Sequence, residues 1–209
     1  GTVELDFCND LWYGESTGVV GLFGKKPEDG PLITNSRQKF FSEKTNRIFC
    51  QTFLDNALRD PITNEIGKTI IFAVSQNHAR KLTEQLNEFA EQLFPGKYNS
   101  DFAVQVTSQV GDAQQMTINF TNNNLSGKTT WLEGYKSCKT RVCVTVGMMT
   151  TGYDCPDLLN ICMMRPIFSP ADFVQIKGRG TRKNTFEFKF KNELKEFQQQ
   201  LNTTFYDSN

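Results

Sequence analysis

Hydrophobic positions along the middle of the chain follow two alternating spacings. Residues 69–74 form a short, apolar, β-branched run that is typical of a buried strand. From Gln76 onward, apolar residues recur at helical spacing until Pro95 and Gly96. The alternation continues, predicting strands at 102–107, 141–146 and 158–164, and helices at 112–120 and from Pro170. Strands separated by helices predict a mostly parallel sheet with helices on both faces, which is a three-layer α/β domain.

The two ends of the chain lack this regular alternation. Residues 1–44 are rich in glycine and turn residues and are predicted to be a connector or arm. A helix is predicted over 45–58, where apolar residues return to helical spacing before Asp60 and Pro61. We therefore expect an arm at 1–44, one α/β lobe at 45–183 and a C-terminal extension at 184–209.

Composition bears on nucleic-acid binding, membrane insertion, disulfides and metal sites. The 209 residues carry 23 basic and 23 acidic side chains, so nucleic acid would have to bind in a local groove. No apolar run reaches the roughly 20 residues that span a bilayer, and we expect a cytoplasmic protein without membrane contact. The six cysteines form no C-x-x-C pair and there is a single histidine, His78. This predicts free thiols and no protein-held metal site.

Two Gly-Lys-Thr triplets raise the question of a triphosphate site. A P-loop needs a further glycine five residues before the Gly-Lys pair, and a helix directly after it. Ile62 and Asn122 occupy those earlier positions, and the triplet at 67–69 leads into a predicted strand. Neither triplet is therefore predicted to hold a phosphate.

Small polar residues follow the predicted strands, where parallel sheets bind ligands. They are Ser75, then Thr107 and Ser108, then Thr150 and Thr151. Hydroxyl groups suit a phosphate backbone, but the same residues are also preferred helix caps. Three such clusters on one edge favour a groove that follows a nucleic-acid strand.

A turn after the third strand brings in a carboxylate. Gly152, Asp154 and Pro156 lie in the stretch VGMMTTGYDCPDL, and this spacing is typical of a tight turn. Asp154 could there accept hydrogen bonds from a ribose hydroxyl. An ordinary surface turn would have the same sequence.

The stretch SPADFVQIKGRGTR predicts a helix with a basic face. Ser169 is a suitable cap and Pro170 suits the first helical position. Gln175, Arg179 and Arg182 fall at positions i, i+4 and i+7 of that helix. Gly178 and Gly180 each cost about 1 kcal/mol relative to alanine, which suggests that something large approaches this face. Two planar guanidinium groups suit a transferring phosphoryl group. The alternative is a solvated basic patch formed with Lys177, Lys183, Lys189 and Lys191.

These residues resemble motifs of superfamily 2 helicases and translocases. IIFAVSQNHARKL resembles motif IV, TVGMMTTGYDCP resembles motif V and QIKGRGTR resembles motif VI, over about 67–183. Such proteins bind ATP between two RecA-like lobes; the first carries the P-loop and the Mg²⁺-binding acidic box, the second the arginine fingers. The chain resembles a second lobe. Within the superfamily it is most similar to the motor (R) subunit of type I restriction enzymes, which pumps duplex DNA before cutting it.

The resemblance implies a role for each matching position. Arg179 and Arg182 would contact the γ-phosphate, and Gln175 would hold an arginine or the phosphate. Gly152, Asp154 and Gly178 would lie at the nucleotide. The residues expected at DNA phosphates are Ser75, Thr107, Ser108, Thr150 and Thr151.

The resemblance also implies partners beyond this chain. ATP would be bound with Mg²⁺ held by a first RecA-like lobe of the same polypeptide, so the isolated chain should hydrolyse no ATP. The other expected partners are double-stranded DNA and the modification and specificity subunits. Two alternatives stay open: a lobe of a DNA repair or RNA helicase, and a catalytically silent nucleic-acid-binding module. A P-loop in the neighbouring sequence would favour a motor.

Overall fold

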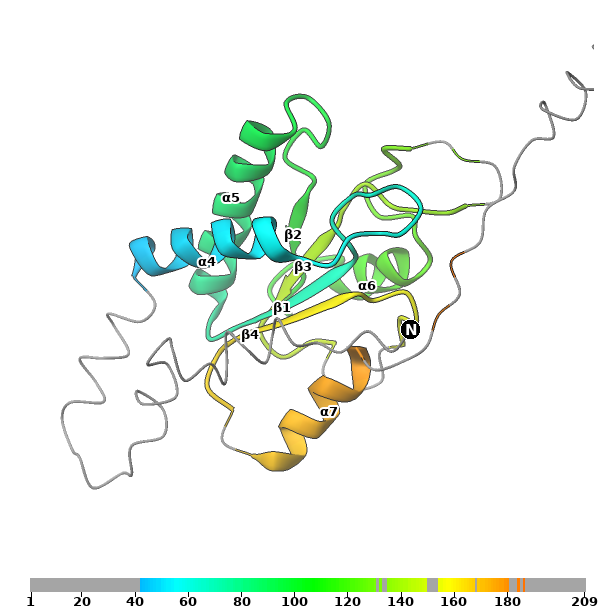
Figure 1. The fold of residues 1–209 in the computed structure, drawn as a ribbon. Helices are drawn as coiled ribbons and strands as arrows, with labels where there is room; N and C mark the ends of the chain where they lie inside the picture. Colours follow the sequence, from blue (N-terminus) through cyan, green and yellow to red (C-terminus); the bar gives the residue numbers. More distant parts are fainter. Residues whose placement is uncertain are drawn as a thin grey trace, which may run out of the picture.

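A computed structural model describes residues 42–130, 132, 135–149, 154–167, 169–180, 184 and 186. Within them, one parallel sheet has the strand order β2-β3-β1-β4 (Figure 1). The strands are β1 (Thr69–Ala73), β2 (Ala103–Gln105), β3 (Val142–Thr145) and β4 (Asn160–Met164). The helices are α4 (Glu43–Asn56), α5 (Gln76–Leu93), α6 (Ala113–Thr121) and α7 (Pro170–Gly180). Because all four strands run the same way, their carboxyl ends share one edge of the sheet and their amino ends share the other.

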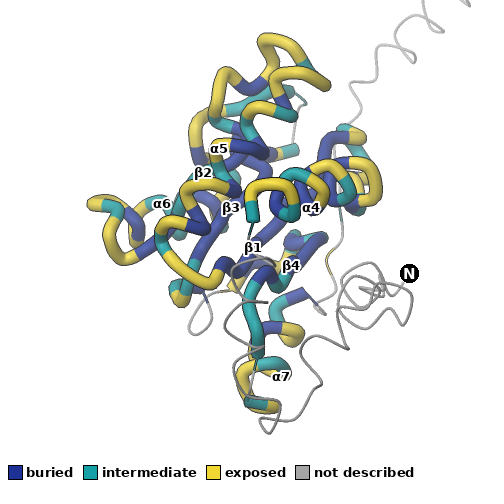
Figure 2. The backbone as a smooth tube through the Cα atoms, turned by 90° about the vertical axis from the view of Figure 1, so that its left-hand side faces the viewer, coloured by how far each residue is buried: buried dark blue, intermediate teal, exposed yellow. Residues whose placement is uncertain are grey.

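Helices cover both faces of this sheet, as the sequence predicts. Successive strand residues point to opposite faces, so the alternation divides the core in two. One core packs α4 and α5 on the sheet through residues that include Phe53, Leu82, Ile71 and Val144. The other packs α6 and α7 through residues that include Phe120, Ile176, Ile70 and Phe72. Figure 2 shows the strands as the buried centre between partly exposed helices. The predicted three-layer α/β fold is confirmed.

The element boundaries differ from the predicted ones by a few residues. Each strand is shorter than predicted by one to three residues. After β2, for example, the amide of Val106 still donates to Val144 O at 2.9 Å, but Val110 N then donates to Thr107 O and closes a turn. The helix predicted over 45–58 spans Glu43–Asn56, because Ser42 caps it by accepting from Thr45 N. Such shifts follow from local caps and turns, which periodicity does not encode.

Residues 1–41 of the predicted arm, and most of the predicted extension at 184–209, lie outside the described residues. In the part that the structure describes, no helix has both the length and the apolarity needed to cross a membrane.

Candidate functional site

The first Gly-Lys-Thr triplet lies at the amino edge of the sheet and is used by the fold. Lys68 Nζ is 2.9 Å from a carboxylate oxygen of Asp157, and the lysine side chain is 3% exposed. Thr69 Oγ1 donates to Gly67 O at 2.7 Å. A Cβ on Gly67 would lie 2.6 Å from Leu58 O, so only glycine fits there. β1 starts at Thr69, so the strand predicted after this triplet is present where a P-loop would be followed by a helix.

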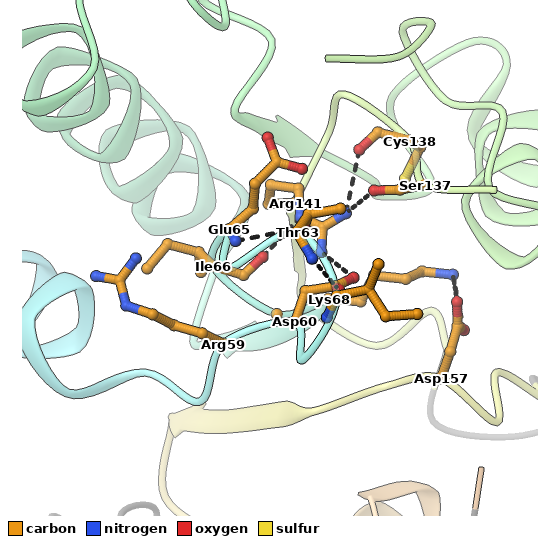
Figure 3. A network of polar contacts seen from close by, with 12 residues as sticks. Arg59, Asp60, Thr63, Glu65, Ile66, Lys68, Ser137, Cys138, Arg141 and Asp157 are labelled. Carbon is orange, nitrogen blue, oxygen red and sulfur yellow. Dashed lines mark hydrogen bonds and ion pairs between the residues drawn. The ribbon is translucent and has the colours of Figure 1, made fainter. Parts of the chain in front are cut away.

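A buried arginine organises the rest of the amino edge (Figure 3). Arg141 is 1% exposed, and its Nε donates to Ile66 O at 2.6 Å while Nη1 donates to Ser137 Oγ at 2.7 Å. Its Nη2 lies 3.6 Å from the carboxylate of Asp60, which also accepts a hydrogen bond from Tyr135 OH. These contacts join loops that are far apart in the sequence. They also satisfy the guanidinium group, because a buried charge must be paired and hydrogen-bonded.

A buried carboxylate, Glu65, and a partly buried one, Asp157, complete this network. Burial opposes ionisation of Glu65, but Lys97, 2.8 Å away, and the Thr129 hydroxyl outweigh it and lower the pKa. Burial likewise opposes ionisation of Asp157, and the charge of Lys68 outweighs it, so this pKa is also lowered. Both carboxylates are therefore ionised and internally paired at neutral pH, and this edge is built for stability.

Polar side chains at the carboxyl edge are more exposed. Ser75 follows β1 and is exposed, and its Oγ accepts from His78 N at 3.2 Å, which makes it the cap of α5. Ser108 follows β2 and is also exposed. Thr107 does not share this exposure: it is 1% exposed, and its Oγ1 lies 3.4 Å from Gln105 Nε2. A phosphate contact by Thr107, expected from the sequence, does not fit this burial.

Helix α7 begins at Pro170, as predicted. Ser169 Oγ accepts from Asp172 N at 3.4 Å, so the predicted cap is present. Ile176 is 1% exposed and anchors the helix on the sheet, whereas Gln175 is exposed and Arg179 is half-buried. A Cβ on Gly178 would meet nothing within 4 Å, so packing among the described residues does not require glycine there.

Several predicted site residues cannot be placed. Arg182, which follows α7, lies outside the described residues. So do Thr150, Thr151 and Gly152, which follow β3. Asp154 is exposed. Cys155 next to it is buried, and its sulfur lies 3.1 Å from Asp157, the partner of Lys68 at the amino edge. The chain after β3 has therefore reached the opposite edge of the sheet by Cys155 and Asp157.

Sequence reasoning missed one cation at this edge, Arg165. It directly follows β4, and its Nη1 donates to Val146 O at 3.0 Å. Its guanidinium carbon lies 5.9 Å from the ring centroid of Phe72 in β1. The signal in the sequence is an arginine directly after an apolar strand, in MMRPIFSP.

The described cysteines are not suited to chemistry. Cys50, Cys138, Cys143, Cys155 and Cys162 are buried free thiols, as predicted. Burial raises the pKa of the Cys50 thiol to about 12 and that of Cys143 well above its usual value. Among the described residues, no group of three or more His, Cys, Asp or Glu side chains could hold a metal ion. The described part of the site therefore offers polar and cationic groups suited to phosphate, but no cluster of acidic ligands for Mg²⁺.

Comparison with known proteins gives this geometry a family context. No family model matches the chain. It is 30% identical over 138 residues to the type I restriction enzyme EcoKI endonuclease subunit of Escherichia coli strain K12, covering 66% of this chain and 10% of that subunit. A fragment of an HsdR subunit of a type I restriction enzyme from Vibrio vulnificus YJ016 matches with a TM-score of 0.54 and 26% identity. This match covers 71% of the chain and 26% of the fragment.

The chain resembles type I restriction endonuclease subunits. Both matches agree with the resemblance carried by its motifs, and they support a helicase-like lobe. The helicase domain of Pyrococcus furiosus Hef is more distant, with a TM-score of 0.39 and 14% identity over 83% of this chain and 31% of that one. The chain spans about a tenth of the length of the EcoKI endonuclease subunit.

Proposed function

We propose that this chain is the second motor lobe of an ATP-dependent DNA translocase, within the R subunit of a type I restriction-modification enzyme. The observation that carries the proposal is the geometry of α7. The helix is anchored on the sheet by Ile176, and it carries Gln175 exposed and Arg179 half-buried one turn later. The likeness to type I restriction endonuclease subunits supports the same reading.

Arg179 and Arg182 act as arginine fingers in this proposal. A guanidinium group aimed at a γ-phosphate stabilises the negative charge that develops during phosphoryl transfer. Gln175 holds an arginine or the phosphate in place. The nucleotide is ATP with Mg²⁺, and the metal is held by a first RecA-like lobe of the same polypeptide. In this proposal Asp154, Gly152 and Gly178 contact the nucleotide.

The contacts with DNA in this proposal are made by hydroxyl side chains at the carboxyl edge. Ser75 and Ser108 are exposed there, and Thr150 and Thr151 follow β3 in the sequence. Their hydroxyls donate to phosphates of double-stranded DNA without reading its sequence. Closure of the two lobes around the nucleotide then changes the grip, and reopening after hydrolysis advances the DNA by a step. Modification and specificity subunits would complete the assembly in the cytoplasm.

The test is made in the intact R subunit that contains this chain. Arg179→Ala and Arg182→Ala, made separately, should each lower DNA-stimulated ATP turnover by about 10³-fold or more, while DNA affinity stays within about threefold. Arg47→Ala is the matched control: this exposed arginine of α4 pairs with Glu88 at 2.9 Å, on the other face of the sheet. The isolated chain should show no ATP turnover. Normal turnover in either arginine variant, or DNA-stimulated turnover by the isolated chain, would refute the proposal.

A further inference from the structure

Arg165 spans the carboxyl edge of the sheet. It leaves the end of β4, yet its Nη1 reaches the carbonyl oxygen of Val146, directly after β3. The strand between these two is β1, and the ring of Phe72 in β1 lies under the guanidinium group. One side chain therefore joins the ends of three strands, at the edge that carries the exposed polar groups.

The turn that Arg165 holds is itself constrained. Thr145 Oγ1 donates to Met148 O at 3.1 Å and closes the turn on itself. Met149 is 4% exposed and has a φ of 67°, a left-handed conformation that is uncommon for a residue with a side chain. Backbone strain of this kind persists only where the surroundings enforce it, and it clusters at functional sites. The turn leads directly into Thr150.

In the other direction, the chain after Arg165 leads to α7. From Arg165 the chain runs to Ser169 and into α7, which carries Gln175 and Arg179. The Nε of Arg165 is buried and has no acceptor among the described residues, so local contacts do not use all of its donors.

We propose that Arg165 is a positioning residue that couples the DNA-contacting turn after β3 to the helix that carries the arginine fingers. The inference rests on the proposed function. A displacement of the turn at Val146 by bound DNA is passed through the guanidinium group to the end of β4, and from there to the start of α7. The guanidinium group donates to Val146 O and lies over the face of Phe72 at the same time. Only a planar group can make both contacts fully, so lysine replaces Arg165 only in part.

The experiment uses the intact R subunit with Arg165→Met and Arg165→Lys. ATP turnover is measured with and without duplex DNA, and affinities for DNA and ATP are measured separately. Arg165→Met should lower DNA stimulation about tenfold or more, within the range of known coupling between sites, and Arg165→Lys should lie between it and the unchanged protein. DNA-independent turnover and both affinities should stay within about twofold. Arg59→Met is the control, because Arg59 also donates to a backbone carbonyl, Asn64 O, but at the amino edge.

Each outcome decides the question. Unchanged stimulation in Arg165→Met refutes the coupling, and so does a loss of affinity or of DNA-independent turnover that matches the loss of stimulation. Should Arg165→Met fail to fold, Arg165→Lys decides alone: lower stimulation at an unchanged melting temperature supports the coupling, and full stimulation refutes it. Normal turnover in Arg179→Ala would refute the motor function itself, which separates that failure from a failure of the coupling.

Discussion

The two edges of the sheet treat polar residues in opposite ways. At the amino edge, Arg141, Lys68 and Glu65 are buried (Figure 3), and each pairs with a side chain of opposite charge. At the carboxyl edge, Ser75 and Ser108 are exposed. The difference shows that a motif must be interpreted by the edge on which it lies. At the amino edge, the Gly-Lys-Thr triplet supplies Lys68 to an internal ion pair and Gly67 to a close backbone contact. The serines at the other edge remain available to a ligand.

Burial explains why the amino edge cannot also serve a ligand. A cation taken out of water is tolerated only with a carboxylate and further hydrogen bonds around it, so its donors are already used. Arg141 and Lys68 both meet this condition, with Asp60 and Asp157 as partners. Changes at this edge should therefore reduce stability, and changes at the carboxyl edge should reduce function.

The largest expected effect is at Arg141. Arg141→Met should lower the free energy of unfolding by about 3–5 kcal/mol, because the carboxylate of Asp60 stays buried after its cationic partner is removed. Urea denaturation of the chain at neutral pH measures this. The matched control is Arg80→Met, because Arg80 pairs with Glu84 at 2.7 Å on the surface of α5 and should contribute at most about 0.5 kcal/mol.

A double variant sharpens this prediction. Adding Asp60→Asn to Arg141→Met removes the stranded charge and should recover part of the lost stability, which a double-mutant cycle reports as a coupling energy. A loss below about 1 kcal/mol for Arg141→Met would mean that the amino edge is not held by its charges.

The sequence predicted the architecture better than the network at the amino edge. Strands and helices show themselves in periodicity, so the parallel sheet and the start of α7 at Pro170 were predicted from local patterns. The partners Asp60 and Arg141 are far apart in the chain and neither lies in a periodic pattern that points to the other. Pairing between distant loops is set by the completed fold, which a single sequence does not display.

The candidate site was predictable in part for the same reason. Position after a strand places Ser75, Thr107 and Ser108 at the carboxyl edge, but it does not say which way a side chain points. Thr107 turned out to be buried. Arg165 was missed because its partner Val146 follows another strand, β3, which lies two places from β4 in the sheet.

The second prediction uses pH to compare the edges. His78 is buried near the carboxyl end of β1, where its Nδ1 accepts from Val74 N at 3.3 Å, so the ring proton lies on Nε2, 3.1 Å from Asn46 Oδ1. Burial, with a smaller contribution from the charge of Lys81, lowers the pKa of His78 to about 4. A lowered histidine pKa stabilises the fold above the unfolded value of about 6.5, and this contribution is lost as the pH falls from there towards 4.

The chain should therefore lose about 2 kcal/mol of stability between pH 7 and pH 5. The amino-edge carboxylates Glu65 and Asp157 have lowered pKa values and stay ionised in the folded chain over this interval. His78 is the only histidine, so His78→Gln should make the free energy of unfolding nearly constant over that interval. A variant that keeps the full pH dependence would assign it to another group.

The smallest expected effect on stability separates the two roles of Ser75. Ser75→Ala removes the cap of α5 and should lower the free energy of unfolding by about 1 kcal/mol. Ser75→Asp keeps a capping oxygen and adds a charge that favours a helix N-terminus, so stability should be retained, yet the same charge repels a phosphate. Ser108→Ala, with no helix to cap, should stay within about 0.5 kcal/mol. If Ser75 contacts DNA as proposed, Ser75→Asp weakens DNA binding by the intact R subunit without loss of stability. Equal DNA affinity in Ser75→Asp and the unchanged subunit would leave Ser75 as a cap alone, and the carboxyl edge would then differ from the amino edge in exposure but not in contact with DNA.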